Sequence, residues 1–330
     1  MKVLIAGDFA PGARLARQIE ARNFSEVFPE NLRDTIKSAD FSFVNFESPV
    51  VEKGYKPITK CGPNLHCTPE AAAAVKYAGF TGVTLANNHI LDFGVDGLRK
   101  TVECCKSQGL DIVGVADNLK EAGKILYLER EGKVLAVINC CEHEFSIATE
   151  TEAGANPLNP VRQFYKIQEA KLKADYVVVI VHGGHEHYQL PSPRMQETYR
   201  FFVDAGADVV VNHHQHCYSG YELYNGKPIF YGLGNFCFDT FPVEVNSTWN
   251  YGYLLELTFE GEIRYKLVPY CQYSKNSNVE LIQDQREFDI QMNKLNEIIA
   301  NPEKLRKCTD DYYFTTSDYM LNVFQPYGNR

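Results

Sequence analysis

The histidines within residues 213–216 are the side chains whose type and spacing most directly indicate chemistry in this sequence. They follow the apolar run 209–211, and a short apolar run bounded by polar residues predicts a buried strand. Sites in α/β proteins lie at the carboxyl ends of such strands. His214 and His216 are two residues apart, so on a turn their imidazoles can converge on one cation. Taken alone, the stretch is equally typical of a surface histidine cluster or of a buried, hydrogen-bonded pair.

Four more apolar strands are predicted to end in polar side chains that suit a metal ion or a hydrolytic reaction. These side chains are Asp8 after residues 3–6, Asn45 and Glu47 at the end of 41–46, Asn88 and His89 after 82–85, and His182 after 177–181. Any one of them has an ordinary explanation, such as a turn, a helix cap or a solvated edge. Five in succession indicate a single site, because so many buried polar groups would be costly without partners and a shared cation would satisfy them.

The donors of this predicted site are oxygen and nitrogen, without thiolate. Such a set fits Mn²⁺, Fe²⁺ or Zn²⁺ better than Ca²⁺, which prefers oxygen cages. Two divalent ions bridged by one carboxylate would polarise a phosphoryl oxygen and generate hydroxide near neutral pH. We expect substrate contacts from Asn45, Asn87, His185 and Glu186, although the last two could equally belong to a solvated loop.

The elements that must position these side chains alternate along the chain as in an α/β protein. Besides the five strands above, we expect strands near 110–113, 133–139, 229–231 and 253–259, helices near 13–22, 32–39, 69–78, 96–107 and 194–205, and a loop at 232–236 beneath the site. The composition changes after residue 276, where Phe288, Met292, Leu295 and Ile299 share one helical face. We therefore predict a main domain at residues 1–272 and a helical cap or arm at 273–330 that packs on the same domain.

Composition narrows the class of partners and the compartment. The 330 residues carry a formal net charge of -9 with no basic run, which argues against nucleic acid. No apolar stretch reaches the roughly 18 residues of a membrane span, and the N-terminus reads as a first strand rather than a signal peptide, so we expect a cytoplasmic protein. The 10 cysteines include adjacent pairs but no Cys-x-x-Cys, which is typical of buried thiols in a reducing compartment.

The order of these motifs resembles the signature series of the calcineurin-like metallophosphoesterases and, more closely, the CapA family of capsule and poly-γ-glutamate biosynthesis proteins. The residues that carry the likeness are Gly7-Asp8, Asn45-Phe46-Glu47-Ser48-Pro49, residues 85–94, Gly206-Ala207-Asp208, and residues 229–238 with their Gly-Asn-Phe. The likeness covers about residues 1–272. It implies a four-layer α-β-β-α sandwich with the site at the strand ends.

The same resemblance implies how the metal ligands divide. Glu47 would be the bridging carboxylate in place of the usual aspartate, Asp8 and His216 would hold one ion, and Asn88, His182 and His214 would hold the other. By the same resemblance His89 would lie near the scissile phosphate as general acid or charge stabiliser, with Asp92 as its orienting partner. The alternative is a structural imidazole held by the Asp92 carboxylate. One departure from the pattern is Ala10, which stands where metallophosphoesterases usually carry a histidine. Two ions per chain are expected. The alternatives are a single ion, or a first site completed by His143, His185 or His187.

Three functions follow as hypotheses. The first is a metal-dependent phosphoesterase linked to capsule, exopolysaccharide or poly-γ-glutamate biosynthesis, with a small-molecule phosphoester or an anionic polymer as substrate. Ala10 motivates the second, a non-catalytic component of a polymer-synthesis complex that binds such a polymer. The third is hydrolysis of an amide such as a γ-glutamyl bond, because activated water attacks carbonyl as well as phosphoryl centres. The physiological substrate and the oligomeric state do not follow from the sequence.

Overall fold

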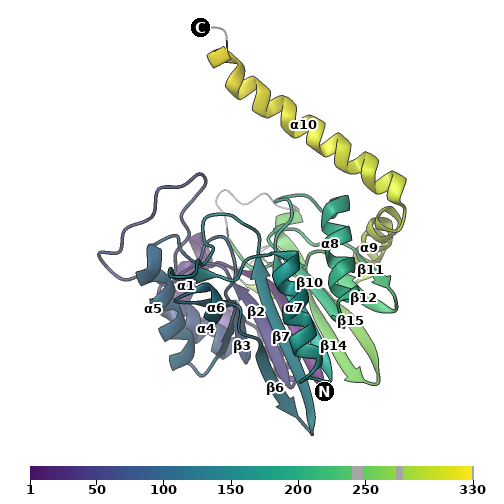
Figure 1. Cartoon of the computed structure of the whole chain (residues 1–330). Coiled ribbons are helices and arrows are strands. Elements are labelled where there is room, and N and C mark those ends of the chain that lie inside the picture. The colour runs from purple at the N-terminus through teal and green to yellow at the C-terminus, as the bar shows by residue number, and fades with distance from the viewer. Residues whose placement is uncertain (240–247, 273–277, 329–330) are drawn as a thin grey trace.

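The computed structural model describes residues 1–239, 248–272 and 278–328, and this part of the chain forms two packed β-sheets with helices outside them (Figure 1). In the first sheet the strands lie in the order β16-β15-β14-β1-β2-β3-β4, with β13 beside β1. Their bounds are β1 (Lys2–Phe9), β2 (Phe41–Phe46), β3 (Gly82–Thr84), β4 (Asp111–Val113), β13 (Asn235–Cys237), β14 (Tyr251–Glu260), β15 (Glu262–Gln272) and β16 (Val279–Leu281). Strands β1 to β4 are parallel, and β14 to β16 pair antiparallel with their neighbours.

The second sheet has the strand order β11-β12-β10-β9-β7-β6. Its strands are β6 (Leu126–Arg130), β7 (Lys133–Cys141), β9 (Tyr176–His182), β10 (Val209–His213), β11 (Tyr221–Tyr224) and β12 (Lys227–Phe230). The central strands β7, β9, β10 and β12 are parallel, and the edge strands β6 and β11 are antiparallel to them. A separate small pair joins β5 (Val115–Ala116) and β8 (Gly154–Ala155).

Side-chain alternation along β1 and β9 explains why each strand can lie between two apolar layers. Val3 of β1 and Val178 of β9 contribute to the core between the sheets. Their neighbours Leu4 and Val177 pack against the outer helices. Successive side chains of a strand point to opposite faces, so a strand covered on both faces must be apolar throughout. The uninterrupted apolar runs 3–6 and 177–181 are therefore the sequence signature of these two central strands.

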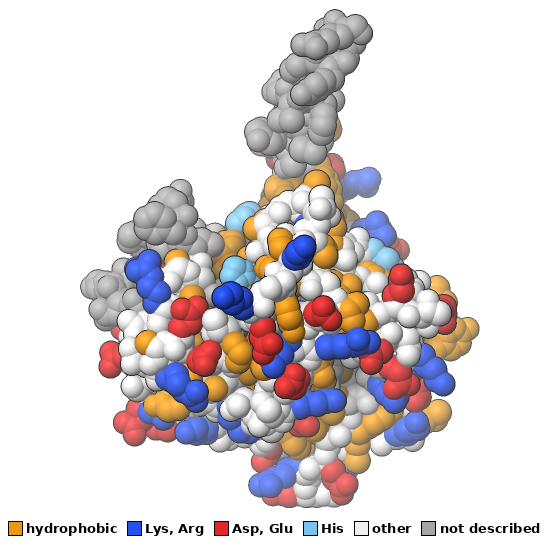
Figure 2. Space-filling model, turned by 90° about the vertical axis from the view of Figure 1, so that its left-hand side faces the viewer, with side chains coloured by type: hydrophobic (Ala, Val, Ile, Leu, Met, Phe, Trp, Pro, Cys, Tyr) orange, Lys and Arg blue, Asp and Glu red, His pale blue; other side chains and the backbone are white. Residues whose placement is uncertain are grey.

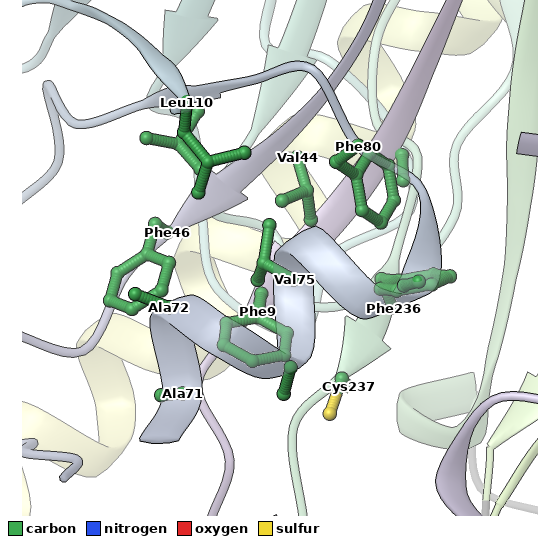
Figure 3. Close-up of a cluster of buried hydrophobic side chains, with 14 of the residues drawn as sticks. Phe9, Val44, Phe46, Ala71, Ala72, Val75, Phe80, Leu110, Phe236 and Cys237 are labelled. Atoms are coloured by element: carbon green, nitrogen blue, oxygen red, sulfur yellow. The ribbon is translucent and has the colours of Figure 1, made fainter. Parts of the chain in front are cut away.

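Helices cover the outer face of each sheet. The first sheet is covered by α1 (Ala13–Glu20), α2 (Phe24–Val27), α3 (Glu30–Lys37), α4 (Glu70–Ala78) and α5 (Gly94–Ser107), and the second by α7 (Pro160–Lys171) and α8 (Pro193–Asp204). A short helix, α6 (Leu119–Ala122), lies beside β5 and β8. Figure 3 shows Ala72 and Val75 of α4 against Phe9, Val44 and Phe46 of the strands. The predicted four-layer α-β-β-α sandwich is confirmed.

The C-terminal segment contains the expected helices and, in addition, the short strand β16. Strand β16 pairs with β15 and so belongs to the first sheet. Helix α9 (Arg286–Ile299) places Phe288 and Met292 in the core between the sheets. Helix α10 (Pro302–Gly328) packs through Leu305 near its start and then extends away from the sheets (Figure 1). The domain boundary at 272/273 stays a prediction, because residues 273–277 lie outside the described part.

The surface carries charges of both signs. Figure 2 shows acidic and basic side chains interspersed over one face of the molecule, with a few histidine side chains reaching the surface. Among the described residues, no helix has both the length and the apolar character needed to cross a bilayer.

Candidate metal centre

Polar residues at or just beyond the carboxyl ends of five strands, β1, β2, β3, β9 and β10, meet where the two sheets come together. Strands β1 and β2 are parallel neighbours in one sheet, and β9 and β10 are parallel neighbours in the other. Parallel neighbours end at the same edge of a sheet, so the side chains that follow them can converge. The six predicted metal ligands that the structure brings together here, all of them buried, are Asp8, Glu47, Asn88, His182, His214 and His216.

Glu47 lies at the centre of this group. Its Oε1 atom is 3.5 Å from Nε2 of His182 and 3.7 Å from Nε2 of His216. The side chain is fully buried, and neither carboxylate oxygen has a hydrogen-bond partner. Burial, reinforced by the charge of Asp8, raises the pKa of Glu47 well above its usual value. A buried carboxylate without a hydrogen-bond partner destabilises the fold by about 1–3 kcal/mol or more unless a cation compensates its charge. The residues present therefore fit a metal ion.

The first cluster consists of Asp8, Glu47 and His216. The Asp8 Oδ2 atom lies 3.4 Å from Nδ1 of His216. Burial opposes ionisation of Asp8, but the hydrogen bond from His216 and the charges of neighbouring histidines hold the pKa of Asp8 well below its usual value. Burial would lower the pKa of His216, yet the carboxylates of Glu47 and Asp8 raise it to about 9. Asn235 Oδ1, 3.0 Å from Nδ1 of His216, helps to fix the ring.

The second cluster consists of Glu47, His182 and His214, with Asn88 beside them. The Nε2 atom of His182 lies 3.0 Å from Oδ1 of Asn88 and 3.1 Å from Nδ1 of His214. Burial lowers the pKa of His182 well below its usual value, and burial together with His216 lowers that of His214 to about 4. Neutral imidazoles are the form that binds metal, so this cluster is ready to accept a cation.

The backbone that presents His214 and His216 is a tight turn. Strand β10 continues through His213, two residues beyond the predicted strand end, and His213 directs Nε2 to the carbonyl oxygen of Ala6 at 3.0 Å. His214 and His216 then have φ values of 89° and 54°. Such angles are uncommon for residues other than glycine and concentrate at functional sites. The turn thereby directs these two imidazoles toward the two clusters.

Gly7 and β13 set the position of Asp8. The segment expected to be a loop at 232–236 instead leads into β13, where Asn235 pairs with Asp8 of β1. The Asp8 N–H donates to the carbonyl oxygen of Gly234 at 3.1 Å. A Cβ atom at position 7 would lie 1.8 Å from that same oxygen. Only glycine lets the two backbones approach so closely, which accounts for the Gly7-Asp8 pair in the sequence.

His89 and Asp92 form the pair that the sequence predicted, together with a lysine from a distant loop. Nδ1 of His89 lies 2.6 Å from Oδ2 of Asp92, and the other carboxylate oxygen lies 2.5 Å from Nζ of Lys60. The Leu65 N–H also donates to Asp92 at 2.6 Å. The side chains of His89, Asp92 and Lys60 are all nearly inaccessible to solvent. No local signal in the sequence connects Lys60 with Asp92.

Asn45 and Asn87, expected to contact substrate, are buried and bonded to the protein. Asn45 Nδ2 donates to Oδ1 of Asp8 at 2.7 Å and lies 3.1 Å from Nδ1 of His182. Asn87 Nδ2 donates to the carbonyl oxygen of Phe46 at 2.9 Å, and its Oδ1 accepts from the His89 N–H at 3.1 Å. These contacts favour positioning roles, and a substrate role for either stays a prediction.

The residues proposed to compensate for Ala10 lie in different surroundings. His185 directs Nε2 to the Tyr313 hydroxyl at 2.6 Å and, with His143, lines a cavity of about 930 Å³ beside α8 and α10. His187 stacks on Trp249, with ring centroids 5.4 Å apart. Neither His143 nor His185 joins the described ligand groups of the two clusters, whereas Glu186 forms one with His214 and His216.

Comparison with known proteins relates this geometry to a family. The family described as bacterial capsule synthesis protein PGA_cap matches residues 2–240. The capsule biosynthesis protein CapA of Bacillus anthracis is 35% identical over 247 residues, which make up 72% of this chain and 60% of that protein. The PGA biosynthesis protein CapA of Bacillus subtilis (strain 168) is 35% identical over 237 residues, which make up 71% of this chain and 62% of that protein. The chain thus spans less than two thirds of the length of these relatives.

A solved structure of a phosphatase from Mycoplasma pneumoniae is also similar, with a TM-score of 0.49 and 17% identity, over 87% of this chain and 98% of that chain. At this level the likeness says nothing about what this chain does. The family match is stronger, because its residues 2–240 include every member of both clusters as well as His89 and Asp92. The chain therefore belongs to the PGA_cap family of bacterial capsule synthesis proteins.

Proposed function

We propose that this protein is a metal-dependent hydrolase of the phosphoesterase type, in which two divalent ions share Glu47. The observation that carries the proposal is the Glu47 carboxylate, which is fully buried, has no hydrogen-bond partner and is flanked by imidazoles on two sides. A cation on each side would compensate it. The surrounding oxygen and nitrogen donors suit Mn²⁺, Fe²⁺ or Zn²⁺.

The two clusters define which residues would hold each ion. Asp8, Glu47 and His216 would hold one, and Glu47, Asn88, His182 and His214 the other. The chemistry that such ions supply is activation of water and polarisation of a phosphoryl oxygen. Asn45 bonds both Asp8 and His182, so it fixes the spacing between the two halves of the site.

His89 would donate a proton to the leaving oxygen of the phosphoester. The carboxylate of Asp92 accepts the hydrogen bond from Nδ1 of His89, which leaves Nε2 available to a substrate atom. Lys60 balances the charge of Asp92 and, with the Leu65 N–H, prevents its rotation. A general acid held in this manner contributes roughly 10²–10⁴-fold to a rate.

The substrate would be a phosphoester involved in the production of a capsule or of poly-γ-glutamate. The names of the relatives in two Bacillus species support this link. The cavity of about 930 Å³ adjoins the second cluster through Glu144, whose Oε2 accepts from Nδ2 of Asn88 at 2.8 Å. A cavity of that size suits the organic part of a substrate, with His185 among its contacts. A cytoplasmic location stays a prediction.

The test is hydrolysis of p-nitrophenyl phosphate and bis-p-nitrophenyl phosphate by protein loaded with Mn²⁺, Fe²⁺ or Zn²⁺. We expect metal-dependent cleavage of at least one ester, its loss in Asp8→Ala and His214→Ala, and a fall of roughly 10²–10⁴-fold in His89→Ala. Glu197→Ala, on the exposed face of α8, is the matched control and should keep the full rate. Metal-loaded protein that cleaves neither ester would contradict the proposal.

A second candidate function is a non-catalytic part of a polymer-synthesis complex that binds an anionic polymer. Ala10 favours it, because the first cluster lacks the side chain that would complete it in related hydrolases. The same metal-loaded protein distinguishes between the two candidate functions. Metal-loaded protein that binds poly-γ-glutamate but hydrolyses neither ester would favour the second.

A further inference from the structure

The loop between β9 and α8 is fixed to the turn that carries His214 and His216. The His187 N–H donates to the carbonyl oxygen of Gln215 at 2.8 Å, and Gln215 Nε2 donates to the carbonyl oxygen of Tyr188 at 2.7 Å. Gln189 Nε2 adds a hydrogen bond to the carbonyl oxygen of Tyr218 at 2.9 Å. On the other side of Glu186, the Gly183 N–H donates to the carbonyl oxygen of His213 at 3.2 Å, so the loop is fixed to strand β10 and its turn both before and after this residue.

Glu186 is the side chain that this loop presents to the site. Its carboxylate lies within 4.8 Å of the ligand atoms of His214 and His216. Its neighbours His185 and His187 instead contact Tyr313 and Trp249. Within the described part of the chain, Glu186 has no hydrogen bond or ion pair and is exposed, so its carboxylate is free to bind a ligand. Its charge raises the pKa of both His214 and His216, although burial of these histidines has the larger, opposite effect.

The first cluster has fewer protein donors than the second. Asp8, Glu47 and His216 supply three ligands, and Ala10, which is buried and apolar, supplies none. The Glu47 carboxylate is aimed into the cluster without a partner, which is independent evidence that a cation belongs there. A divalent ion of this kind takes four or more protein or solvent ligands.

We propose that Glu186 is a ligand of the ion at the first cluster and takes the place of the histidine that Ala10 lacks. The proposal rests on the metal centre of the proposed function. It gives the first cluster three carboxylates and one imidazole, against one carboxylate, one amide and two imidazoles at the second. Oxygen-rich sets favour Mn²⁺, and imidazole-rich sets favour Zn²⁺. The two halves of the centre therefore differ in metal preference.

The experiment is a titration of the purified chain with Mn²⁺ alone, in which binding is measured by calorimetry and by electron paramagnetic resonance. The variants are Glu186→Ala and Glu186→Gln, with Glu197→Ala as an exposed glutamate control and His214→Ala to mark the second cluster. Glu186→Ala should weaken one Mn²⁺ site at least about tenfold and leave the other unchanged. Glu186→Gln should weaken the same site less, because an amide oxygen can still bind. Circular dichroism melting of the metal-free variants should match the wild type.

The outcomes separate this inference from the proposed function. If the wild type bound no Mn²⁺, Fe²⁺ or Zn²⁺, the metal centre of the proposed function would itself be contradicted. A wild type with two Mn²⁺ sites, matched in both affinities by Glu186→Ala, would leave the metal centre intact and overturn the role of Glu186. Loss in Glu186→Ala of the same site that His214→Ala loses would also overturn it, because Glu186 would then serve the second cluster.

Discussion

The two clusters share Glu47 but differ in how the protein prepares them. In the second cluster, His182 and His214 are kept neutral by burial, and Asn88 is held by Glu144. In the first, Asp8 and His216 already pair with each other, and the position of Ala10 offers no donor. The second cluster is thus preorganised for a cation, whereas under our proposal the first also depends on Glu186 of the loop between β9 and α8. If both ions bind as proposed, one fold keeps half of a two-metal centre while changing the other half.

The largest effect is expected from Glu47→Gln, because Glu47 belongs to both clusters. This variant should lose both ions and all metal-dependent hydrolysis. Without metal its melting temperature should equal or exceed that of the wild type, since the substitution removes a buried carboxylate that has no hydrogen-bond partner. With Mn²⁺ at about 100 times its dissociation constant, the wild type should gain about 2.7 kcal/mol per site and the variant nothing.

Thermal melts with and without Mn²⁺ measure both effects. A metal-free Glu47→Gln protein that melts well below the metal-free wild type would show that Glu47 serves the fold through contacts that its buried position does not reveal. Glu47 could then no longer be regarded as a ligand that the two clusters share.

An intermediate effect is expected from variants that remove a ligand of one cluster only. Asp8→Ala should empty the first cluster and His182→Ala the second, so each protein should retain one ion where the wild type holds two. Elemental analysis after dialysis gives the metal content per chain. Loss of both ions in either variant would mean that the clusters are one cooperative site instead of two unequal halves.

The smallest effect is expected from Glu144→Ala, which touches the second cluster through Asn88. The half-exposed Glu144 is not a member of either cluster, so its removal should weaken metal binding at the second cluster by about 10–100-fold and leave the first unchanged. Zn²⁺ titration in competition with a chromophoric chelator measures this. Equal weakening at both clusters would contradict the separation between them.

Much of the fold and the composition of the site could be predicted from short-range patterns. Apolar runs such as 177–181 mark strands covered on both faces, and polar residues directly after them mark the edge where a site forms. The two-residue spacing of His214 and His216 indicated convergence. These features depend on neighbours in the sequence, so the sequence alone reveals them.

Contacts between distant segments could not be predicted in this way. Lys60 pairs with Asp92 across 32 positions, and Asn235 orients His216 from a strand that was expected to be a loop. Neither contact leaves a local pattern in the sequence, because each depends on where a distant segment lies in the folded chain. For the same reason the sequence does not reveal that the amide of Asn45 links Asp8 to His182.

The central claim is that Glu47 is shared by two ions, and anomalous scattering tests it most directly. Crystals of the protein grown with Mn²⁺ would be measured on both sides of the manganese absorption edge. The account predicts two anomalous peaks, one between Glu47, Asp8 and His216 and one between Glu47, His182 and His214. The absence of any peak within bonding distance of Glu47, about 2.0–2.2 Å, would contradict it.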